Sequence, residues 1–175
     1  MSDPLVDMVV CVDKNWAIGK NGKLLYHISE DMKRFKALTE FGNVIYGRKT
    51  LETFPTRLGL PNRNNILLTT DEDAHYGVTI RVAHNIMEAL NYCNKDLYTF
   101  VIGGQSVYEQ FLKYANKIYV TKVCDAVEGA DSFFPDLDKI PQFKLSTVTK
   151  SKDENYKYKF CVYTRSNSLK AKVFQ

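Results

Sequence analysis

Two short apolar runs that each end in glycine limit the folds open to this chain more than any other feature. They are V-I-Y-G-R-K-T at 44–50 and F-V-I-G-G-Q-S at 100–106. Short, continuous apolar runs are typical of strands buried on both faces, as in parallel sheets. Helix-like sequence follows each run, so both predict strand–turn–helix units of an α/β fold.

The rest of the chain continues this alternation. We predict further strands at 5–12, 66–70, 78–82 and 117–123, and helices at 29–39, at 86–93 with Asn85 as N-cap, and after 104 with Val107, Tyr108, Phe111 and Leu112 on one face. Alternating segments at 143–149 and 156–163 flank a polar turn and predict an antiparallel hairpin. We expect one α/β domain over residues 1–165, with a mostly parallel mixed sheet, an antiparallel C-terminal hairpin and about four helices. A tail covers 166–175.

The segment 28–39, I-S-E-D-M-K-R-F-K-A-L-T, predicts a helix that carries a carboxylate beside an apolar face. Ser29 is the predicted N-cap. Ile28, Met32, Phe35 and Thr39 share one stripe, with Asp31 at its edge, whereas Glu30, Lys33 and Arg34 point away. Asp31 is therefore either an ordinary first-turn acid or a functional group.

Composition sets the class of protein but not the reaction. The chain has 175 residues, 45% of them hydrophobic, and a net charge of +4. No apolar run approaches the roughly 20 residues of a membrane span, and we expect no secretion signal. The four cysteines are scattered without metal-ligand spacing, which predicts reduced thiols in a cytoplasmic protein and no metal.

The two glycine turns also predict a site for an anionic ligand. Glycine lets the backbone approach a ligand, and Arg48 and Lys49 can pair with phosphate. Two such turns at one sheet edge could hold the two ends of a dinucleotide. Residues 42–50 nearly match a P-loop, but arginine stands at the lysine position and the loop is strand-like; the G-x-G-x-x-G fingerprint is absent.

Other candidate features are weak. The long segment 13–27 is predicted as a loop, and long ordered loops are often functional. His27, His75 and His84 are isolated, so we expect surface or structural roles for them. The lysine–aromatic alternation at 157–160 is typical of a strand with one polar face rather than of a nucleic-acid site.

Seven motifs in order resemble bacterial dihydrofolate reductases over residues 6–165. They are W-A-I-G-K-N-G at 16–22, H-I-S-E-D-M-K-R-F-K at 27–36, V-I-Y-G-R-K-T at 44–50, L-P-N-R-N-N-I-L-L-T at 60–69, V-I-G-G-Q-S-V-Y-E-Q-F-L at 101–112, I-Y-V-T at 118–121 and D-S-F-F-P at 131–135. The resemblance implies NADPH-dependent reduction of 7,8-dihydrofolate, with hydride passing to C6 and a proton reaching N5 through water.

The resemblance also implies a substrate site. It assigns Asp31 as the ionisable group of the pterin pocket, Thr121 as its supporting hydroxyl, and Tyr26 as a hydroxyl that binds water. Arg63 matches the arginine that binds the substrate's α-carboxylate. The implied walls of the pocket are Val9, Leu24, Phe35, Phe54, Leu60 and Ile102, with the carbonyls of Val9 and Ile102 at the pterin edge.

The implied cofactor residues fall in three groups. Cys11, Ile18 and Tyr108 match positions around the nicotinamide. Thr69 and Thr70 match the hydroxyl position near the 2′-phosphate. The phosphate-binding turns are Gly47, Arg48, Lys49 and Thr50, together with Gly103, Gly104, Gln105, Ser106 and Val107. The segment 13–27 matches the lid over the nicotinamide.

The chain departs from the family pattern at two places. Leu25 and Tyr26 replace a proline and an aromatic residue, usually tryptophan, and Ser106 stands where some relatives have arginine. Expected ligands are dihydrofolate and antifolate inhibitors, with no nucleic acid or membrane, and the protein is expected to be a monomer. Two alternatives stay open: a same-fold pyrimidine or pterin reductase of riboflavin-type synthesis, and a non-catalytic nucleotide- or RNA-binding module.

Overall fold

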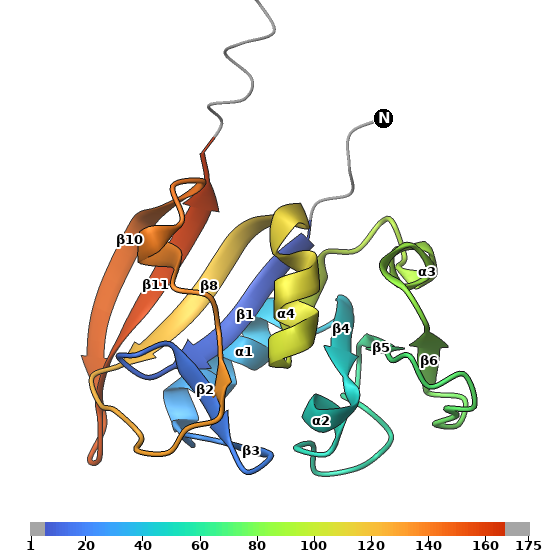
Figure 1. Cartoon of the computed structure of the whole chain (residues 1–175), viewed down its shortest axis with the longest axis horizontal. Coiled ribbons are helices and arrows are strands. Elements are labelled where there is room, and N and C mark those ends of the chain that lie inside the picture. The colour runs from blue at the N-terminus through green and yellow to red at the C-terminus, as the bar shows by residue number, and fades with distance from the viewer. Residues whose placement is uncertain (1–5, 167–175) are drawn as a thin grey trace, which may run out of the picture.

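A twisted eight-stranded sheet runs through the centre of the molecule (Figure 1). The computed structural model describes residues 6–166, so most of the predicted tail lies outside the described residues. The strand order is β10-β11-β8-β1-β7-β4-β5-β6. The strands are β1 (Val6–Val12), β4 (Asn43–Gly47), β5 (Asn64–Leu68), β6 (Ile80–Ala83), β7 (Thr99–Gly103), β8 (Ala115–Val123), β10 (Phe143–Lys152) and β11 (Lys157–Arg165).

The strand directions confirm the predicted mixed sheet. Every neighbouring pair from β8 to β6 is parallel, and β10 and β11 add an antiparallel hairpin at one edge. The carboxyl ends of β1, β4, β5 and β7 therefore meet along one edge. Parallel sheets bind ligands at this edge, beside the points where the strand order reverses.

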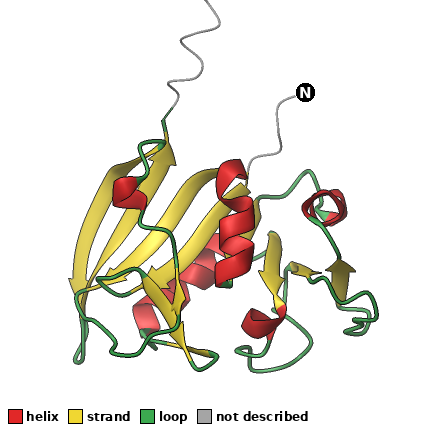
Figure 2. Ribbon diagram, in the orientation of Figure 1, coloured by secondary structure: helices red, strands yellow, loops and turns green. Residues whose placement is uncertain are grey.

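Helices cover both faces of the sheet (Figure 2). They are α1 (Ser29–Thr39), α2 (Arg48–Leu51), α3 (Ile86–Tyr92) and α4 (Gln105–Phe111), with 3₁₀ turns at Leu112–Tyr114 and Leu137–Lys139. Alternate strand residues face opposite ways: Ile45 joins the core beneath α3 and α4, whereas Val44 and Tyr46 join the core beneath α1. The predicted apolar face of α4 is confirmed, because Val107, Tyr108 and Phe111 are buried.

The segment predicted as a loop over 13–27 contains two short strands, and that prediction was wrong. The strands β2 (Ala17–Lys20) and β3 (Lys23–Leu24) form a small sheet with β9 (Ser132–Phe133). Gly19 pairs with Ser132 across more than a hundred residues of sequence. Local periodicity cannot detect strands this short whose partner is so distant.

The start of α1 is also corrected. Ile28, not Ser29, is the N-cap, and no side chain caps the helix. Ile28 is buried in a cluster with Val123 and Tyr158. Its carbonyl accepts the first helical hydrogen bond, from Met32 N at 3.0 Å. Burial of this isoleucine thus starts the helix one residue before the position that serine favours. The predicted Asn85 cap of α3 is confirmed, since its Oδ1 accepts from Glu88 N at 2.9 Å.

Two strand boundaries differ from the prediction by about two residues. The strand predicted at 66–70 lies at Asn64–Leu68, and the one predicted at 78–82 lies at Ile80–Ala83. Asn64 Nδ2 donates to Asn43 Oδ1 at 2.8 Å, so β5 begins with a polar residue. A search for apolar runs does not include such a residue in the strand. Among the described residues no helix is long and apolar enough to cross a membrane. All four cysteines are free.

Candidate active site

Two cavities adjoin at the carboxyl edge of the parallel strands. The larger has a volume of 540 Å³ and the smaller 210 Å³. Five residues line both of them: Ile18, Leu24, Thr50, Thr53 and Gly104. Ligands bound in the two cavities would therefore be neighbours and would contact the same five residues.

The smaller cavity contains nearly all of the predicted substrate residues. It lies between α1, β1 and β7, and its walls are mostly apolar. The predicted residues that line it are Val9, Leu24, Asp31, Phe35, Phe54, Leu60 and Ile102. Of the described residues that line it, Asp31 is the one with a charged side chain, so a bound ligand would meet a single carboxylate among apolar walls. Such a carboxylate favours a ligand with paired N–H donors.

Asp31 is half-buried on the first turn of α1, and its surroundings shift its pKa in opposite directions. Burial raises its pKa above the ordinary value. A hydrogen bond from Thr121, the charge of Arg34 and a hydrogen bond from Cys11 act in the other direction. Thr121 Oγ1 donates to Asp31 Oδ1 at 2.5 Å. The structure thus joins the predicted carboxylate to its predicted supporting hydroxyl.

Strand register explains how Thr121 reaches Asp31. Cys11 near the end of β1 lies opposite Thr121 of β8. Both therefore stand beside the first turn of α1. Burial raises the pKa of the Cys11 thiol, and the nearby Asp31 charge adds to this effect. Cys11 is consequently a neutral thiol in the wall of the smaller cavity, adjacent to the carboxylate.

Three predicted residues line neither cavity: Thr121, which contacts Asp31 from outside, and Tyr26 and Arg63. Tyr26 Oη donates to Asp125 Oδ2 at 3.2 Å and its ring packs edge-on against Tyr156. The structure therefore directs the Tyr26 hydroxyl toward Asp125, and the water-binding role predicted for it has no support in this arrangement. Arg63 is held by Pro61 O at 2.7 Å and by Thr39 Oγ1 at 3.1 Å, just beyond Leu60 of the pocket wall.

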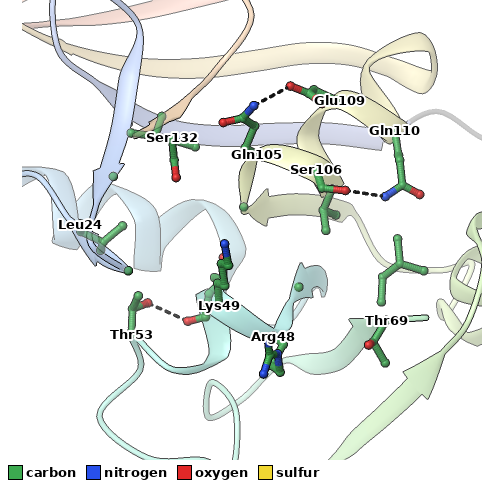
Figure 3. A pocket seen from close by; sticks show the side chains of 18 of the residues that line it. Leu24, Arg48, Lys49, Thr53, Thr69, Gln105, Ser106, Glu109, Gln110 and Ser132 are labelled. Atoms are coloured by element: carbon green, nitrogen blue, oxygen red, sulfur yellow. Dashed lines mark hydrogen bonds between the residues drawn. The ribbon is translucent and has the colours of Figure 1, made fainter. Parts of the chain in front are cut away.

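The larger cavity lies between the α2 turn and the α4 turn (Figure 3). Arg48 and Lys49 extend from α2, and Gln105 and Ser106 stand opposite at the start of α4. The predicted cofactor residues that line it are Ile18, Gly47, Arg48, Lys49, Thr50, Thr69, Thr70, Gly104, Gln105, Ser106 and Val107. The other three, Cys11, Gly103 and Tyr108, line the smaller cavity. The described lining also includes Lys23, Glu109 and Asp131, so three cations stand beside two carboxylates. This excess of positive charge and the hydroxyls of the lining suit a phosphorylated ligand.

Two glycines of these turns, Gly47 and Gly103, leave little space for a side chain. Gly103 has φ +138°, and a Cβ there would lie 2.7 Å from Thr50 Oγ1. A Cβ on Gly47 would lie 3.1 Å from Val107 Cγ2. Each glycine thus makes room for a side chain from the opposite turn, since β4 and β7 are neighbours in the sheet. Because these positions carry no side chain, a ligand can approach the main chain of the two turns.

The small sheet β3-β2-β9 covers one side of both cavities. Asp13, which is 1% exposed, accepts hydrogen bonds from Asn15 N, Ala17 N and Val127 N at 2.8, 2.9 and 3.0 Å. Gln105 Oε1 accepts from Phe133 N at 2.8 Å, which ties β9 to α4. One buried carboxylate therefore orders the segment 13–17 and joins it to the segment around 127.

Comparison with known proteins assigns the family. The family model described as dihydrofolate reductase matches residues 5–165. A dihydrofolate reductase of Bacillus subtilis (strain 168) is 35% identical over 97% of this chain and 100% of its own length. One of Staphylococcus haemolyticus is 35% identical over 91% and 95%. The chain belongs to the dihydrofolate reductase family.

A solved structure agrees with this assignment. A dihydrofolate reductase from Enterococcus faecalis, complexed with NADP(H) and RAB-propyl, superimposes with a TM-score of 0.82 and 30% identity, over 93% of this chain and 97% of that one. The protein is an NADPH-dependent reductase of dihydrofolate. NADPH fits the larger cavity, because the glycines of the two turns let a ligand approach the protein backbone and because Arg48 and Lys49 supply positive charge.

Sequence reasoning missed several lining residues of this dihydrofolate reductase. Met32 and Pro55 line the smaller cavity, and His84 and Ser132 line the larger one. Met32 is 45% exposed because it faces the cavity, although the helical stripe predicted burial. His84 Nδ1 lies 3.1 Å from Thr69 O, which places the ring beside the predicted 2′-phosphate residues. The position of His84 one residue after β6, at the ligand edge, was the signal that could have found it.

Proposed function

We propose that Asp31 is the ionisable group on which reduction of dihydrofolate depends in this protein. The observation that carries the proposal is that, within residues 6–166, only Asp31 brings a charged side chain to the smaller cavity. A carboxylate there can accept hydrogen bonds from the amino group and a ring nitrogen of the pterin. Its negative charge then favours protonation of N5, which makes the C6–N5 imine more electrophilic.

The reaction adds a hydride to C6 and a proton to N5. Bound NADPH supplies the hydride and leaves as NADP⁺. Asp31 and Thr121 orient the pterin, supported by the 2.5 Å hydrogen bond between them. The apolar walls from Val9 to Ile102 exclude bulk water from the ring, while a single water delivers the proton. The segment 13–27 acts as the lid, supported by Ile18 and Leu24, which line both cavities.

The remaining binding roles follow from charge and position. Arg63 binds the α-carboxylate of the substrate tail with its planar guanidinium. Arg48, Lys49 and the hydroxyls of Thr69 and Thr70 bind the phosphates of NADPH, and so favour it over NADH. Antifolates that copy the pterin bind in the smaller cavity against the same carboxylate.

The proposal also covers the oligomeric state of the protein and its location in the cell. We infer a monomer, because the described chain alone supplies every lining residue of both cavities. We also infer a cytoplasmic location, which agrees with four free cysteines. Light scattering of the purified protein tests the first inference. The comparisons favour this reductase over both the riboflavin-type reductase and the nucleotide- or RNA-binding module.

The variant Asp31→Asn tests the central role. Because the amide cannot provide the negative charge, we expect kcat/KM for dihydrofolate near neutral pH to fall by about 10²–10³-fold. NADPH absorbance loss in the presence of dihydrofolate measures this rate.

Asp7→Asn is the matched control. Asp7 is also a half-buried carboxylate of raised pKa, caused chiefly by burial, but it lines neither cavity. We expect this variant to keep wild-type turnover. Unchanged turnover in Asp31→Asn, with NADPH still bound, would remove Asp31 from the mechanism.

A further inference from the structure

Arg34 is a half-buried cation one helical turn after the proposed catalytic carboxylate. Its Cζ lies 4.5 Å from the ring centroid of Phe160 on β11 and 5.8 Å from that of Tyr119 on β8. The sequence placed Arg34 away from the apolar stripe of α1, and the structure shows that it is nevertheless half-buried there. Helix α1 packs against the strands of the C-terminal hairpin as well as against the pocket, so this side of the helix is covered too.

Arg34 and Asp31 affect one another without forming an ion pair. Burial lowers the pKa of Arg34, and the Asp31 charge opposes this most strongly. The ion pairs among the described residues are Lys122–Asp138 and Lys139–Asp136, so Arg34 does not bridge to Asp31. The two charges therefore interact through space.

The other groups around Asp31 carry no positive charge. Cys11 of β1 and Tyr108 of α4 are neutral, because burial raises the pKa of both. Thr121 of β8 contributes a hydroxyl. On α1, Lys33 is exposed, and Glu30 accepts from Tyr158 Oη at 2.6 Å and Ser151 Oγ at 2.7 Å. Arg34 is thus the cation best placed to balance Asp31.

We propose that Arg34 is a positioning residue whose guanidinium, held on the rings of Phe160 and Tyr119, serves as a through-space counter-charge for Asp31. The inference rests on the proposed role of Asp31. A guanidinium in a direct bidentate ion pair would occupy the oxygens that the pterin needs. Stacked on aromatic rings, it stabilises the ionised carboxylate and leaves it open to the ligand.

The geometry favours arginine over lysine at this position. A planar guanidinium stacks on a ring face and keeps its charge even when partly buried. Phe160 lies opposite Thr121 in the strand register. Phe160, whose ring holds the cation, and Thr121, whose hydroxyl contacts Asp31, are therefore a cross-strand pair. This pairing fixes the spacing between the two charges.

The test is the titration of Asp31 in the ligand-free protein, followed by carbon-13 NMR of its carboxyl carbon and assigned with Asp31→Asn. Arg34→Met removes the cation and keeps the apolar stem. On the alkaline side of the wild-type pKa we expect the protonated fraction of Asp31 to rise about threefold. Lys33→Met removes the same net charge from an exposed neighbour, and here the fraction should stay within about 1.3-fold of wild type, as expected for a screened surface charge.

Two further variants keep the test decisive. Arg34→Gln removes the charge with a polar side chain and replaces Arg34→Met if that protein does not fold. Arg34→Lys keeps the charge, and should restore most of the wild-type titration. A carboxyl titration in the neutral variants that matches wild type would overturn the counter-charge.

The pH dependence of kcat/KM separates this inference from the proposed function. In the neutral variants the acid limb of the rate profile, where Asp31 gains its proton, should move to higher pH together with the carboxyl titration. If the titration moves and the rate profile does not, the counter-charge stands and the proposed role of Asp31 fails.

Discussion

At the scale of single residues, the proposed chemistry depends on one carboxylate, Asp31, that the fold does not stabilise in its ionised form. Asp31 has a raised pKa because burial outweighs the hydrogen bond from Thr121. A group of this kind is retained for function at a cost to stability. The ionised form is the one that burial disfavours, so the cost depends on pH.

The variant Asp31→Asn should be more stable than wild type while it is nearly inactive. Below the ordinary aspartate pKa both folded and unfolded chains are protonated, and the two proteins should be equally stable. Above the raised folded pKa the wild type bears the full cost of a buried charge. We therefore expect a gain that grows as pH rises and reaches about 0.5–1 kcal/mol near neutral pH.

Urea denaturation of both proteins at several pH values measures this gain. Asp7→Asn serves again for comparison, because its pKa is also raised chiefly by burial but a hydrogen bond from the Lys117 backbone opposes the effect. A gain for Asp31→Asn that is constant with pH would contradict the argument, since it would then not arise from ionisation.

Residue chemistry was predictable where the signal is local. Asp31 and the two glycine turns could be predicted because a carboxylate beside an apolar helix face, or a glycine after a strand, can be recognised from a few neighbouring residues. Tyr26 and Arg34 could not be placed, since their surroundings come from residues near 120, 156 and 160. The seven family motifs supplied the role of Thr121, which no local pattern indicates.

At the scale of elements, the segment 13–27, which we propose as the lid, depends on one buried side chain. Asp13 accepts from three backbone donors, two through Oδ1 and the Val127 donor through Oδ2. An asparagine keeps the first oxygen and loses the second. The link between the lid and the segment before β9 would then lack its acceptor, and a buried N–H would have no partner.

Asp13→Asn should therefore loosen the lid and lower stability. We expect the unfolding free energy to fall by about 1–3 kcal/mol, the usual cost of an unsatisfied buried donor. The KM for NADPH should rise several-fold, because Ile18 of β2 lines both cavities.

Asp153→Asn is a matched control in the turn between β10 and β11. There Oδ1 alone accepts from Asn155 N at 2.8 Å and Tyr156 N at 2.7 Å, and an asparagine retains that oxygen. This variant should change stability by less than about 0.5 kcal/mol. Equal losses in the two variants would show that Asp13 is an ordinary turn residue.

Longer elements were easier to predict than short ones. The hairpin β10–β11 and the helix α4 show clear periodicity, whereas β2, β3 and β9 have two to four residues each. Such strands are stabilised by their pairing and not by their own sequence. This explains why the lid was expected as a loop.

At the scale of the whole molecule, strand order is what makes one site from distant segments. Strand β7 is inserted between β1 and β4, so the turn at Gly103 lies beside both Cys11 and the Arg48 turn. Alternating strands and helices predicted a parallel sheet but not this order, because several crossovers satisfy the same pattern. The order became predictable only through the family resemblance.

The shared wall between the cavities predicts cooperative binding. Ile18, Leu24, Thr50, Thr53 and Gly104 contact both cavities, so a bound NADP(H) orders side chains that a pterin ligand also requires. The second ligand then loses less conformational freedom. We expect an antifolate to bind about 5–150-fold more tightly with cofactor present, and by linkage the cofactor gains the same factor.

Calorimetric titration in both orders measures this coupling, and the two factors must agree because the cycle closes. Ile18→Ala removes a shared side chain and should reduce the coupling, while Met87→Ala, on an exposed part of α3, should leave it unchanged. If Ile18→Ala weakened each ligand alone but kept the factor between them, the coupling would not pass through the shared wall. It would then have to come from direct contact between the two ligands or from closure of the lid.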